Sequence, residues 1–357
     1  MKVCIDIQSV VKNPTGVGRY TLELVKALAR IQNRPEIFLT YFNFLGRYRG
    51  LDCFPNKQVR IIPGRVYNQL WKRWHWPPLN WFTGKFDIYH FPNFCRPPLS
   101  AKNAKSIITV HDVAFKRYPE YIEPKNLIFL ENELQSSLKK CDRIIAVSRF
   151  TKNELIELFS VDPGKIVVIY EGLGDNFRKV EDKTMDLPPQ YVLCLGTLEP
   201  RKNIEGLIRA FALCRLSGFK LVLAGGRGWL GGGIPKLIAR LGLEKEIIFT
   251  GYIPEGRLAE LYSRAGVFVF PSFYEGFGLP PLEAMACGTP VVSTRLEVLG
   301  EAARVVSPGN PEDIAAGIKE VLRNPGEYIS KGLVQAGKYT WSKTAEATLG
   351  LYRSLAI

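Results

Sequence analysis

The sequence contains no run of eighteen or more apolar residues, so we expect no membrane-spanning helix. Its opening residues, MKVCIDIQSV, are typical of a short strand and are too weakly flanked for a signal peptide. The seven cysteines form no Cys-x-x-Cys motif, and most of them lie in apolar runs, which is typical of reduced core residues. These absences predict a cytoplasmic protein.

The usual metal-binding patterns are missing as well. The three histidines, His75, His90 and His111, do not have the spacing of metal ligands, and the chain has no Asp-x-Asp triplet. We therefore expect that neither a metal nor a cofactor is required.

Charge is unevenly distributed along the chain, whose net charge is +14. Residues 1–170 carry 26 Lys and Arg against 14 Asp and Glu, whereas residues 171–357 carry 22 against 20. A basic excess of this kind indicates an anionic partner, and nucleic acid, a phosphorylated substrate and acidic lipid are the alternatives.

Strand-like and helix-like segments alternate along the chain, which is typical of parallel sheets covered by helices on both faces. The 357 residues exceed the usual size of one domain. The pattern restarts after a polar segment at 175–190, which predicts two doubly wound domains, residues 1–172 and 173–340. Strands are expected at 3–7, 37–42, 59–62, 88–91, 106–110, 143–147 and 166–169, and then at 191–196, 220–224, 247–250, 267–270, 290–293 and 303–306.

The most informative segment is SFYEGFGLPPLEAM, residues 272–285. It places Glu275 and Glu283 on either side of a turn that leads into a helix. A helix N-terminus attracts phosphate, and Gly276 and Gly278 let the backbone approach a ligand closely. Two carboxylates beside a phosphate site predict a ligand that is both a sugar and a diphosphate.

The helix of this segment is expected at 282–287, with Glu283 in its first turn. In the alternative interpretation Glu283 only stabilises its own helix, as any acidic residue in a first turn does. That alternative leaves Glu275 and the two glycines unexplained.

The longer stretch FYEGFGLPPLEAMACGTPVV resembles the Glu-x7-Glu motif of retaining nucleotide-sugar glycosyltransferases of family 4. This resemblance implies the GT-B fold, in which two Rossmann-like domains face each other across a cleft. It also implies that Glu275 contacts the donor sugar and that Glu283 holds the ribose. The amides of Phe277, Gly278 and Leu279 would contact the diphosphate.

Two cations, Arg201 and Lys202, stand in the segment GTLEPRKN after a strand-like run. An isolated Arg-Lys pair is usually a solvated surface pair, but both side chains also suit a diphosphate. The resemblance implies that they bind the leaving phosphates. Asn203 is expected to cap the following helix.

His111 follows the strand expected at 106–110. The resemblance implies that it contacts the primary hydroxyl of the donor sugar, and the alternative is a loop histidine with a structural role. His90, at the end of an earlier strand, is expected to be structural.

The segment PTGVGRY contains Gly16 and Gly18 ahead of a helix expected at 18–31. A lone Gly-x-Gly is weak evidence, but the resemblance implies a glycine loop over the donor diphosphate. The sequence departs here from the commoner GGxGR form, which leaves open which glycine approaches the ligand. The resemblance also implies that residues near the nucleobase are Gly225, Arg227, Tyr252 and Ile253. For the glycine-rich segment 225–233, the alternative is a mobile loop tip without a role in binding.

Residues 67–82 (YNQLWKRWHWPPLNWF) hold four of the six tryptophans, interleaved with Lys72 and Arg73. Tryptophan and basic residues together favour the surface of an anionic membrane. The alternative is a helix that packs its aromatic side chains into the first domain. Single-stranded nucleic acid also suits this pattern, but no RNA-binding motif accompanies it.

The resemblance covers nearly the whole chain and is strongest to bacterial mannosyltransferases that build surface polysaccharides. It implies a retaining glycosyltransferase that moves a hexose, with GDP-mannose as the first choice of donor, to a glycan or lipid-linked acceptor. The last helix, within residues 341–357, would cross back onto the first domain. The alternatives are a non-catalytic nucleotide-sugar-binding protein and a GT-B nucleotide-sugar epimerase. We expect a location in the cytoplasm, and the alternative is a peripheral position on the cytoplasmic face of the membrane.

Overall fold

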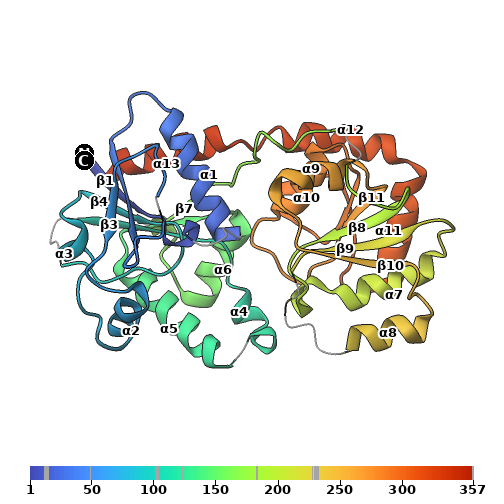
Figure 1. Cartoon of the computed structure of the whole chain (residues 1–357), viewed down its shortest axis with the longest axis horizontal. Coiled ribbons are helices and arrows are strands. Elements are labelled where there is room, and N and C mark those ends of the chain that lie inside the picture. The colour runs from blue at the N-terminus through green and yellow to red at the C-terminus, as the bar shows by residue number, and fades with distance from the viewer. Residues whose placement is uncertain are drawn as a thin grey trace. The chain divides into compact units, whose positions relative to one another are not determined.

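The computed structural model describes residues 1–11, 16–48, 50–100, 104–122, 124–181, 184–226, 228 and 233–355. The chain divides into two compact units. Unit 1 comprises Met1–Arg117, Glu123–Gly172 and Trp341–Ile357, and unit 2 comprises Tyr118–Ile122 and Leu173–Thr340. Each unit is a parallel sheet with helices on both faces (Figure 1).

In the described part of unit 1, the sheet has seven parallel strands in the order β3-β2-β1-β4-β5-β6-β7. The strands are β1 (Lys2–Asp6), β2 (Glu36–Phe42), β3 (Asn56–Val59), β4 (Ile88–Phe91), β5 (Lys105–Val110), β6 (Arg143–Ala146) and β7 (Ile166–Val168). The chain winds outward in one direction from β1 and in the other from β4. The carboxyl ends of β1 and β4 therefore form the switch point at which such sheets bind ligands.

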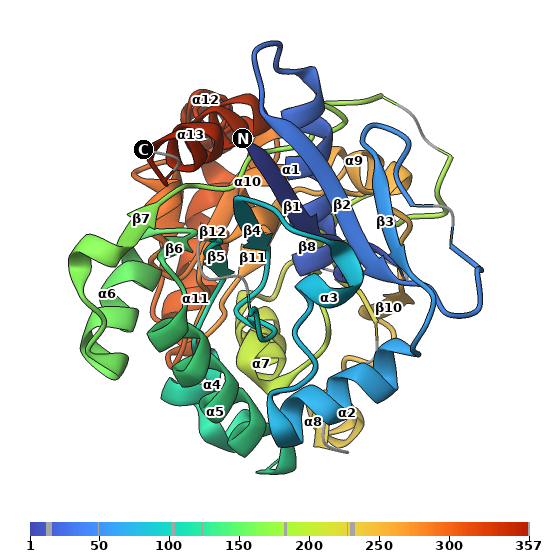
Figure 2. The same ribbon diagram turned by 90° about the vertical axis from the view of Figure 1, so that its left-hand side faces the viewer.

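Helices cover both faces of this sheet. Helices α1 (Gly16–Arg30) and α13 (Trp341–Leu355) lie on one face, and α5 (Pro124–Lys140) and α6 (Arg149–Phe159) lie on the other (Figure 2). The unit also contains α2 (Gly64–Trp74), α3 (Asn80–Thr83) and α4 (Ala114–Arg117). Leu24 and Leu28 of α1 share one buried core with Leu349 of α13.

A buried histidine fastens α13 to the sheet. His90 of β4 has no exposed surface, and its Nδ1 lies 2.6 Å from the hydroxyl of Tyr352 in α13. Its Nε2 lies 3.0 Å from the hydroxyl of Thr109 in β5. Burial lowers the pKa of His90 to about 3, so the ring is neutral and structural, as the sequence predicted.

In unit 2, the described residues form a six-stranded parallel sheet in the order β10-β9-β8-β11-β12-β13. The strands are β8 (Tyr191–Leu195), β9 (Lys220–Ala224), β10 (Ile247–Gly251), β11 (Val267–Phe270), β12 (Val291–Ser293) and β13 (Ala303–Val305). One face carries α7 (Ile204–Cys214), α8 (Gly233–Leu241) and α11 (Pro311–Arg323), and the other carries α9 (Glu255–Ser263), α10 (Leu279–Ala286) and α12 (Pro325–Ala336). The switch point of this sheet lies between β8 and β11.

Most of the predicted strands and helices are present, and the main differences are these. The third strand was expected at 59–62, but β3 covers Asn56–Val59. The apolar run that suggested the later position leaves the sheet, and the Ile61 side chain is 83% exposed. Helices α2 and α12 were not predicted as separate elements. The predicted helix at 282–287 begins earlier, at Leu279, because Gly278 serves as its N-cap and two prolines occupy its first turn.

Candidate active site

In unit 2, the loops after two neighbouring strands bring two cations to one carboxylate. The Oε1 atom of Glu275, after β11, lies 2.5 Å from the Nζ atom of Lys202, after β8. Its Oε2 atom lies 3.1 Å from a guanidinium nitrogen of Arg201. Burial opposes the ionisation of Glu275, but the charges of Lys202 and Arg201 outweigh it and hold its pKa below the ordinary value. Glu275 is therefore an ionised, partly enclosed carboxylate at the switch point of the sheet.

Arg201 is itself held in place by its neighbours. Its guanidinium donates to Glu199 Oε1 at 2.7 Å and to the backbone carbonyl of Tyr274 at 2.6 Å. The second bond ties the loop after β8 to the residue next to Glu275. This arrangement holds the guanidinium in one geometry, as recognition of an anion through two parallel hydrogen bonds requires.

Asn203 caps α7, as predicted. Its side-chain oxygen accepts a hydrogen bond from the amide of Gly206 at 3.2 Å. Its Nδ2 donates to the carbonyls of Pro271 and Pro308. The cap therefore also joins the loops after β8, β11 and β13.

Glu283 lies elsewhere than predicted within its helix. Because α10 begins at Leu279, Glu283 falls in the second turn and not in the first. Its side chain is buried, and its Oε2 accepts a hydrogen bond from the hydroxyl of Tyr262 at 2.8 Å. Stabilisation of its own helix terminus therefore does not account for Glu283.

The turn before α10 is closely packed. Gly278 has a φ of +103°, and a Cβ atom there would lie 2.6 Å from the Leu296 side chain. Phe277 is buried and contacts the ring of Tyr339 edge-on at 5.8 Å. The backbone of the turn Gly276–Leu279 is therefore held in one conformation, and the position before α10 requires a glycine, Gly278.

Glycines stand at the carboxyl ends of three neighbouring strands, β8, β9 and β10. The amide of Gly225, after β9, donates to the carbonyl of Gly251 at 2.9 Å. A Cβ atom on Gly225 would lie 1.9 Å from the carbonyl oxygen of Gly196, after β8. Gly196 in turn packs against the Lys202 side chain. These glycines form a continuous backbone edge that begins beside the Lys202–Glu275 pair.

The predicted nucleobase contacts follow this edge. Tyr252 directly follows Gly251 and is 74% exposed, and Ile253 is partly buried. Gly225 belongs to the edge itself, whereas Arg227 lies outside the described residues. Side chains for a base contact are thus next to the glycine edge in unit 2.

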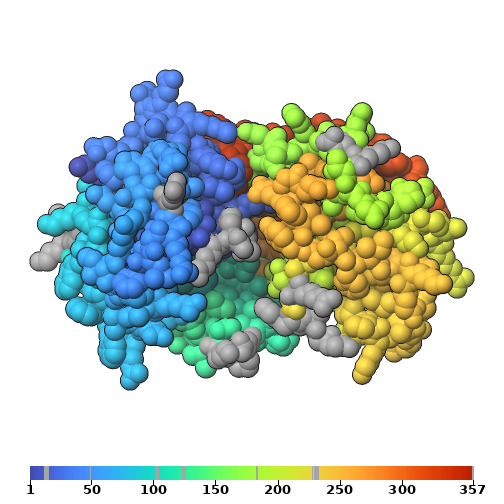
Figure 3. Space-filling view, in the orientation of Figure 1, coloured from blue at the N-terminus to red at the C-terminus, as the bar shows by residue number. Residues whose placement is uncertain are grey.

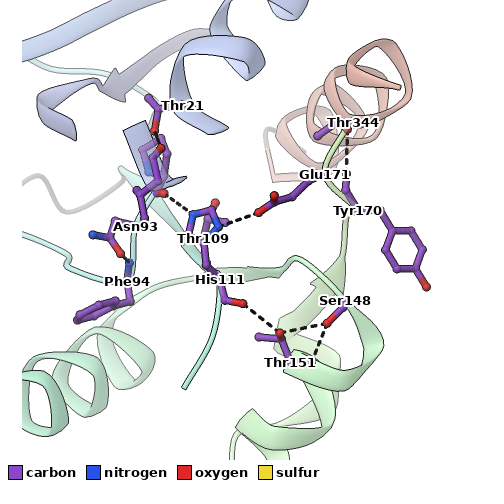
Figure 4. Close-up of polar contacts among 12 residues, drawn as sticks. Thr21, Asn93, Phe94, Thr109, His111, Ser148, Thr151, Tyr170, Glu171 and Thr344 are labelled. Carbon is purple, nitrogen blue, oxygen red and sulfur yellow. Dashed lines mark hydrogen bonds and ion pairs between the residues drawn. The ribbon is translucent and has the colours of Figure 1, made fainter. Parts of the chain in front are cut away.

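In unit 1, His111 follows β5 and is held from two sides (Figure 4). Its Nδ1 lies 2.9 Å from Glu171 Oε1, and its Nε2 lies 3.0 Å from the carbonyl oxygen of Pro92. Both partners are acceptors, so both ring nitrogens carry a proton. Burial opposes the charge on the ring, but Glu171 and the Pro92 carbonyl outweigh it and raise the pKa of His111.

Glu171 was not identified from the sequence. It is buried and follows β7, so it too stands beyond the carboxyl end of a strand. Its position shortly after a strand is the feature by which the sequence could have identified it. The ring of Tyr20 completes the surroundings of His111, because it contacts the imidazole edge-on at 4.7 Å.

Gly16 and Gly18 also belong to unit 1 and lie inside the first turn of α1, which begins two residues earlier than expected. The predicted glycine loop is thus partly helical, and its first two residues, 14 and 15, lie outside the described residues. Gly16 is exposed, and a Cβ atom there would contact nothing within 4 Å. Gly18 is buried against the unit.

The tryptophan-rich segment is divided between core and surface. Trp71 of α2 is 6% exposed, so it packs in the core of unit 1. Trp74, Trp76 and Trp81 are 60%, 52% and 61% exposed. The packing interpretation is therefore confirmed for Trp71, and the membrane interpretation stays a prediction for the three exposed tryptophans.

Within the described residues, no helix is both long enough and apolar enough to cross a bilayer. The same residues contain no group of three or more His, Cys, Asp or Glu side chains arranged to hold a metal ion.

Known proteins resemble this chain over its whole length. The family model "Glycosyltransferase Family 4" matches residues 14–175, and "Glycosyl transferases group 1" matches residues 175–339. O-antigen chain mannosyltransferase B of Escherichia coli is 32% identical and covers 99% of this chain and 100% of its own length. O-antigen chain mannosyltransferase RfbU of Salmonella typhimurium is 27% identical and covers 90% of this chain and 91% of its own length.

Solved structures share the fold. Sucrose-phosphate synthase from Thermosynechococcus elongatus has a TM-score of 0.78 at 22% identity and covers 99% of this chain and 98% of its own. Anabaena HepE in complex with UDP and glucose has a TM-score of 0.72 at 18% identity, with 99% and 100% covered. Fold and sequence together define a glycosyltransferase of the GT-B class. The chain belongs to the family 4 glycosyltransferases.

Proposed function

We propose that this enzyme transfers mannose from GDP-mannose to a glycan or lipid-linked acceptor during the synthesis of a surface polysaccharide. The full-length similarity to O-antigen chain mannosyltransferase B supports the sugar and the pathway. The observation that carries the catalytic proposal is the ionised Glu275 between Lys202 and Arg201 at the switch point.

The charge that develops during the reaction determines the roles that we propose for these three residues. When the bond between the sugar C1 and the diphosphate breaks, negative charge grows on the leaving phosphate oxygens. Arg201 and Lys202 would stabilise that charge from fixed positions, which lowers the barrier because no reorganisation is needed. Glu275 would accept hydrogen bonds from sugar hydroxyls and so position C1.

The reaction is proposed to retain the configuration at C1. The acceptor hydroxyl would attack on the face that the phosphate leaves, so the new C1–O bond forms there as the old one breaks. The hydroxyl proton would pass to the leaving phosphate. This route needs no protein nucleophile and no metal.

The remaining contacts would follow the glycine edge of unit 2. The amides of the turn Gly276–Leu279 would bind the diphosphate at the N-terminus of α10, and Glu283 would hold the ribose. Tyr252 and Ile253 would border the base. From unit 1, Gly16 and Gly18 would cover the diphosphate, and His111 would contact the primary hydroxyl of the sugar after exchanging its bond to Pro92.

A peripheral membrane contact is part of the proposal. Much of the face of unit 1 that Figure 3 shows comes from the first quarter of the chain, coloured blue. Among the described residues, seven of the fifteen large apolar side chains that are exposed lie between residues 44 and 81. Trp74, Trp76 and Trp81 stand there with Lys72 and Arg73, a combination that favours an anionic bilayer surface.

The first experiment is a thermal-shift panel of GDP, UDP, dTDP and ADP with their sugar conjugates. A ligand at 100 times its dissociation constant stabilises the folded protein by about 2.7 kcal/mol, which is readily measured. Stabilisation by GDP and GDP-mannose alone supports the proposed donor. Stabilisation by another nucleotide reassigns the donor, and no stabilisation by any of them contradicts nucleotide-sugar binding.

Glu275→Gln separates the enzyme from the two alternatives. In a transferase this variant loses roughly 100-fold or more in kcat while it still binds the nucleoside diphosphate. A binding protein has no turnover to lose. An epimerase converts its nucleotide sugar without any acceptor, so an acceptor-free assay of the unmodified protein identifies it.

A further inference from the structure

Unit 2 contains a short segment that comes from the first half of the chain. Residues Tyr118–Ile122 belong to unit 2, whereas the chain up to Arg117 belongs to unit 1, and so does the chain that follows the segment as far as Gly172. The segment forms a turn of 3-10 helix at Pro119–Tyr121, in which the amide of Tyr121 donates to the carbonyl of Tyr118 at 3.1 Å. A proline in this turn restricts its backbone. We call Tyr118–Ile122 the tyrosine segment.

The two tyrosines of this segment pack on the loop that follows β11. The rings of Tyr118 and Tyr121 are stacked, with centroids 5.7 Å apart and an angle of 1° between their planes. The centroid of each ring lies 6.3 Å from that of Phe273. Tyr118 also meets the ring of Tyr274 edge-on at 6.1 Å. Aromatic pairs at such distances attract one another, so the four rings hold the segment and the loop together.

The loop residues that receive these rings also bind Arg201 and lead directly into Glu275. The amide of Phe273 donates to the carbonyl of Arg201 at 2.9 Å. The guanidinium of Arg201 donates in turn to the carbonyl of Tyr274 at 2.6 Å. Glu275 is the next residue, and its carboxylate pairs with Arg201 and Lys202. The two residues on which the tyrosines pack therefore set the backbone position from which Glu275 reaches its cations.

Packing of the tyrosines covers a ring at the start of this loop. Phe273 is only partly buried with the tyrosines in place, whereas Tyr274 is 6% exposed. Without the tyrosines, the ring of Phe273 would lose packing partners and be more open to water. A segment with fewer packed contacts opens more easily. A displacement of about 1 Å at a reacting centre can cost roughly 100-fold in rate, so such mobility would matter for a transferase.

We propose that Tyr118 and Tyr121 are positioning residues of the transferase. Their rings hold the loop after β11 in place, and so fix the Glu275 carboxylate beside the two cations of the site. The tyrosines act on the reaction through Glu275. This inference rests on the proposed function and adds to it a requirement that comes from the first half of the chain.

The test measures turnover in the absence of an acceptor, as release of the nucleoside diphosphate from the nucleotide sugar that the thermal-shift panel selects. In this reaction water attacks C1 of the sugar as the bond from C1 to the diphosphate breaks, and a proton of the water passes to the leaving phosphate. A radiolabelled donor allows slow rates to be followed. The proteins are the unmodified chain, Tyr118→Leu/Tyr121→Leu and Tyr118→Phe/Tyr121→Phe. Phe249→Leu, which replaces an exposed ring of β10 in unit 2, is the matched control.

The leucine double variant is expected to lose roughly 100-fold in kcat and to keep its affinity for the nucleoside diphosphate within about threefold. The phenylalanine double variant keeps the rings and should retain activity. The hydroxyl bond that it loses, from Tyr118 to the Phe273 carbonyl, is long at 3.4 Å. Phe249→Leu should change neither quantity.

A double-mutant cycle with Glu275→Gln separates positioning from a general loss of structure. In the Glu275→Gln background the leucine substitutions should cost less than about threefold in kcat, because the residue through which they act is already impaired. Undiminished activity of the leucine double variant overturns the inference. Losses that multiply with that of Glu275→Gln overturn it as well.

A melting curve shows whether the leucine double variant folds. If it does not, the single variant Tyr121→Leu takes its place in the cycle, with an expected loss of about tenfold, and the same two outcomes overturn the inference. Failure of the proposed function is distinguishable, because the unmodified chain would then release no nucleoside diphosphate from any nucleotide sugar.

Discussion

Lys202 and Glu275, separated by 73 positions, hold their Nζ and Oε1 atoms 2.5 Å apart across the switch point of the second sheet. Each side chain is only 12% exposed. A carboxylate with so little contact with water stays ionised because its cations stay with it. The pair is therefore a structural unit as well as the centre of the proposed active site.

Removal of one member of this pair should destabilise unit 2. Lys202→Met leaves Glu275 enclosed with one cation, Arg201, in place of two and should lower the free energy of unfolding by about 3 kcal/mol. The double variant Lys202→Met/Glu275→Gln should recover part of that loss, because no unpaired charge remains. Urea unfolding of the two variants checks this, and an equal loss in both would show that the pair does not act as a unit.

The contact between His111 and Glu171 should be visible as a titration. Because the folded-state pKa of His111 is raised, the pair stabilises unit 1 fully below the unfolded pKa of about 6.5. That stabilisation is lost as the pH rises through the folded pKa. In Glu171→Gln the pKa of His111 should fall, as measured from the imidazole proton shifts by NMR. His90 is the internal control, and an unchanged His111 titration would contradict the pairing.

Ionised Asp6 should destabilise the folded protein, whereas the His111–Glu171 pair stabilises it. Its folded pKa of about 6 lies above the ordinary value of 3.8, so the folded state favours the protonated carboxyl. Ionisation therefore costs the fold about 2–3 kcal/mol above pH 6, and that cost disappears at low pH. Asp6→Asn should raise the melting temperature at pH 7.5 and leave it nearly unchanged at pH 4. A gain that is the same at both values would show that ionisation of Asp6 is not the cause.

The exposed tryptophans should govern membrane binding. The rings of Trp76 and Trp81 meet edge-on with centroids 5.9 Å apart and are both more than half exposed. Their double replacement by alanine should reduce co-sedimentation with phosphatidylglycerol vesicles several-fold, while phosphatidylcholine vesicles bind little in either case. Val334→Ala, a variant of an exposed apolar residue of unit 2, serves as the matched control. Unchanged sedimentation of the tryptophan variant would remove the membrane from the proposal.

The sequence predicted the two sheets well because parallel strands in such folds are short apolar runs with polar ends. It also marked Glu275, Arg201 and Lys202, since each follows a strand. It could not predict that β8 lies next to β11, because strand order is a tertiary property, and the 2.5 Å contact depends on that order.

For a similar reason, the sequence did not predict the cavity that Asp6, Tyr67 and Trp71 line in unit 1. Tyr67 and Trp71 were assigned either to a membrane surface or to the core. Helix α2 brings both side chains to the cavity that Asp6 lines at the carboxyl end of β1, and this arrangement follows only from the fold. Glu171 escaped notice because its partner His111 lies 60 positions away.

The order in which the chain leaves the ribosome bears on how unit 1 folds. Trp341, Leu349 and Tyr352 of α13 belong to the same buried core as β1 and α1, which are made before unit 2. Nearly all of unit 2 is synthesised in between, as the continuous stretch Leu173–Thr340. The first-made half therefore has to wait with an uncovered apolar face until the last helix emerges, and the later half is free to finish first.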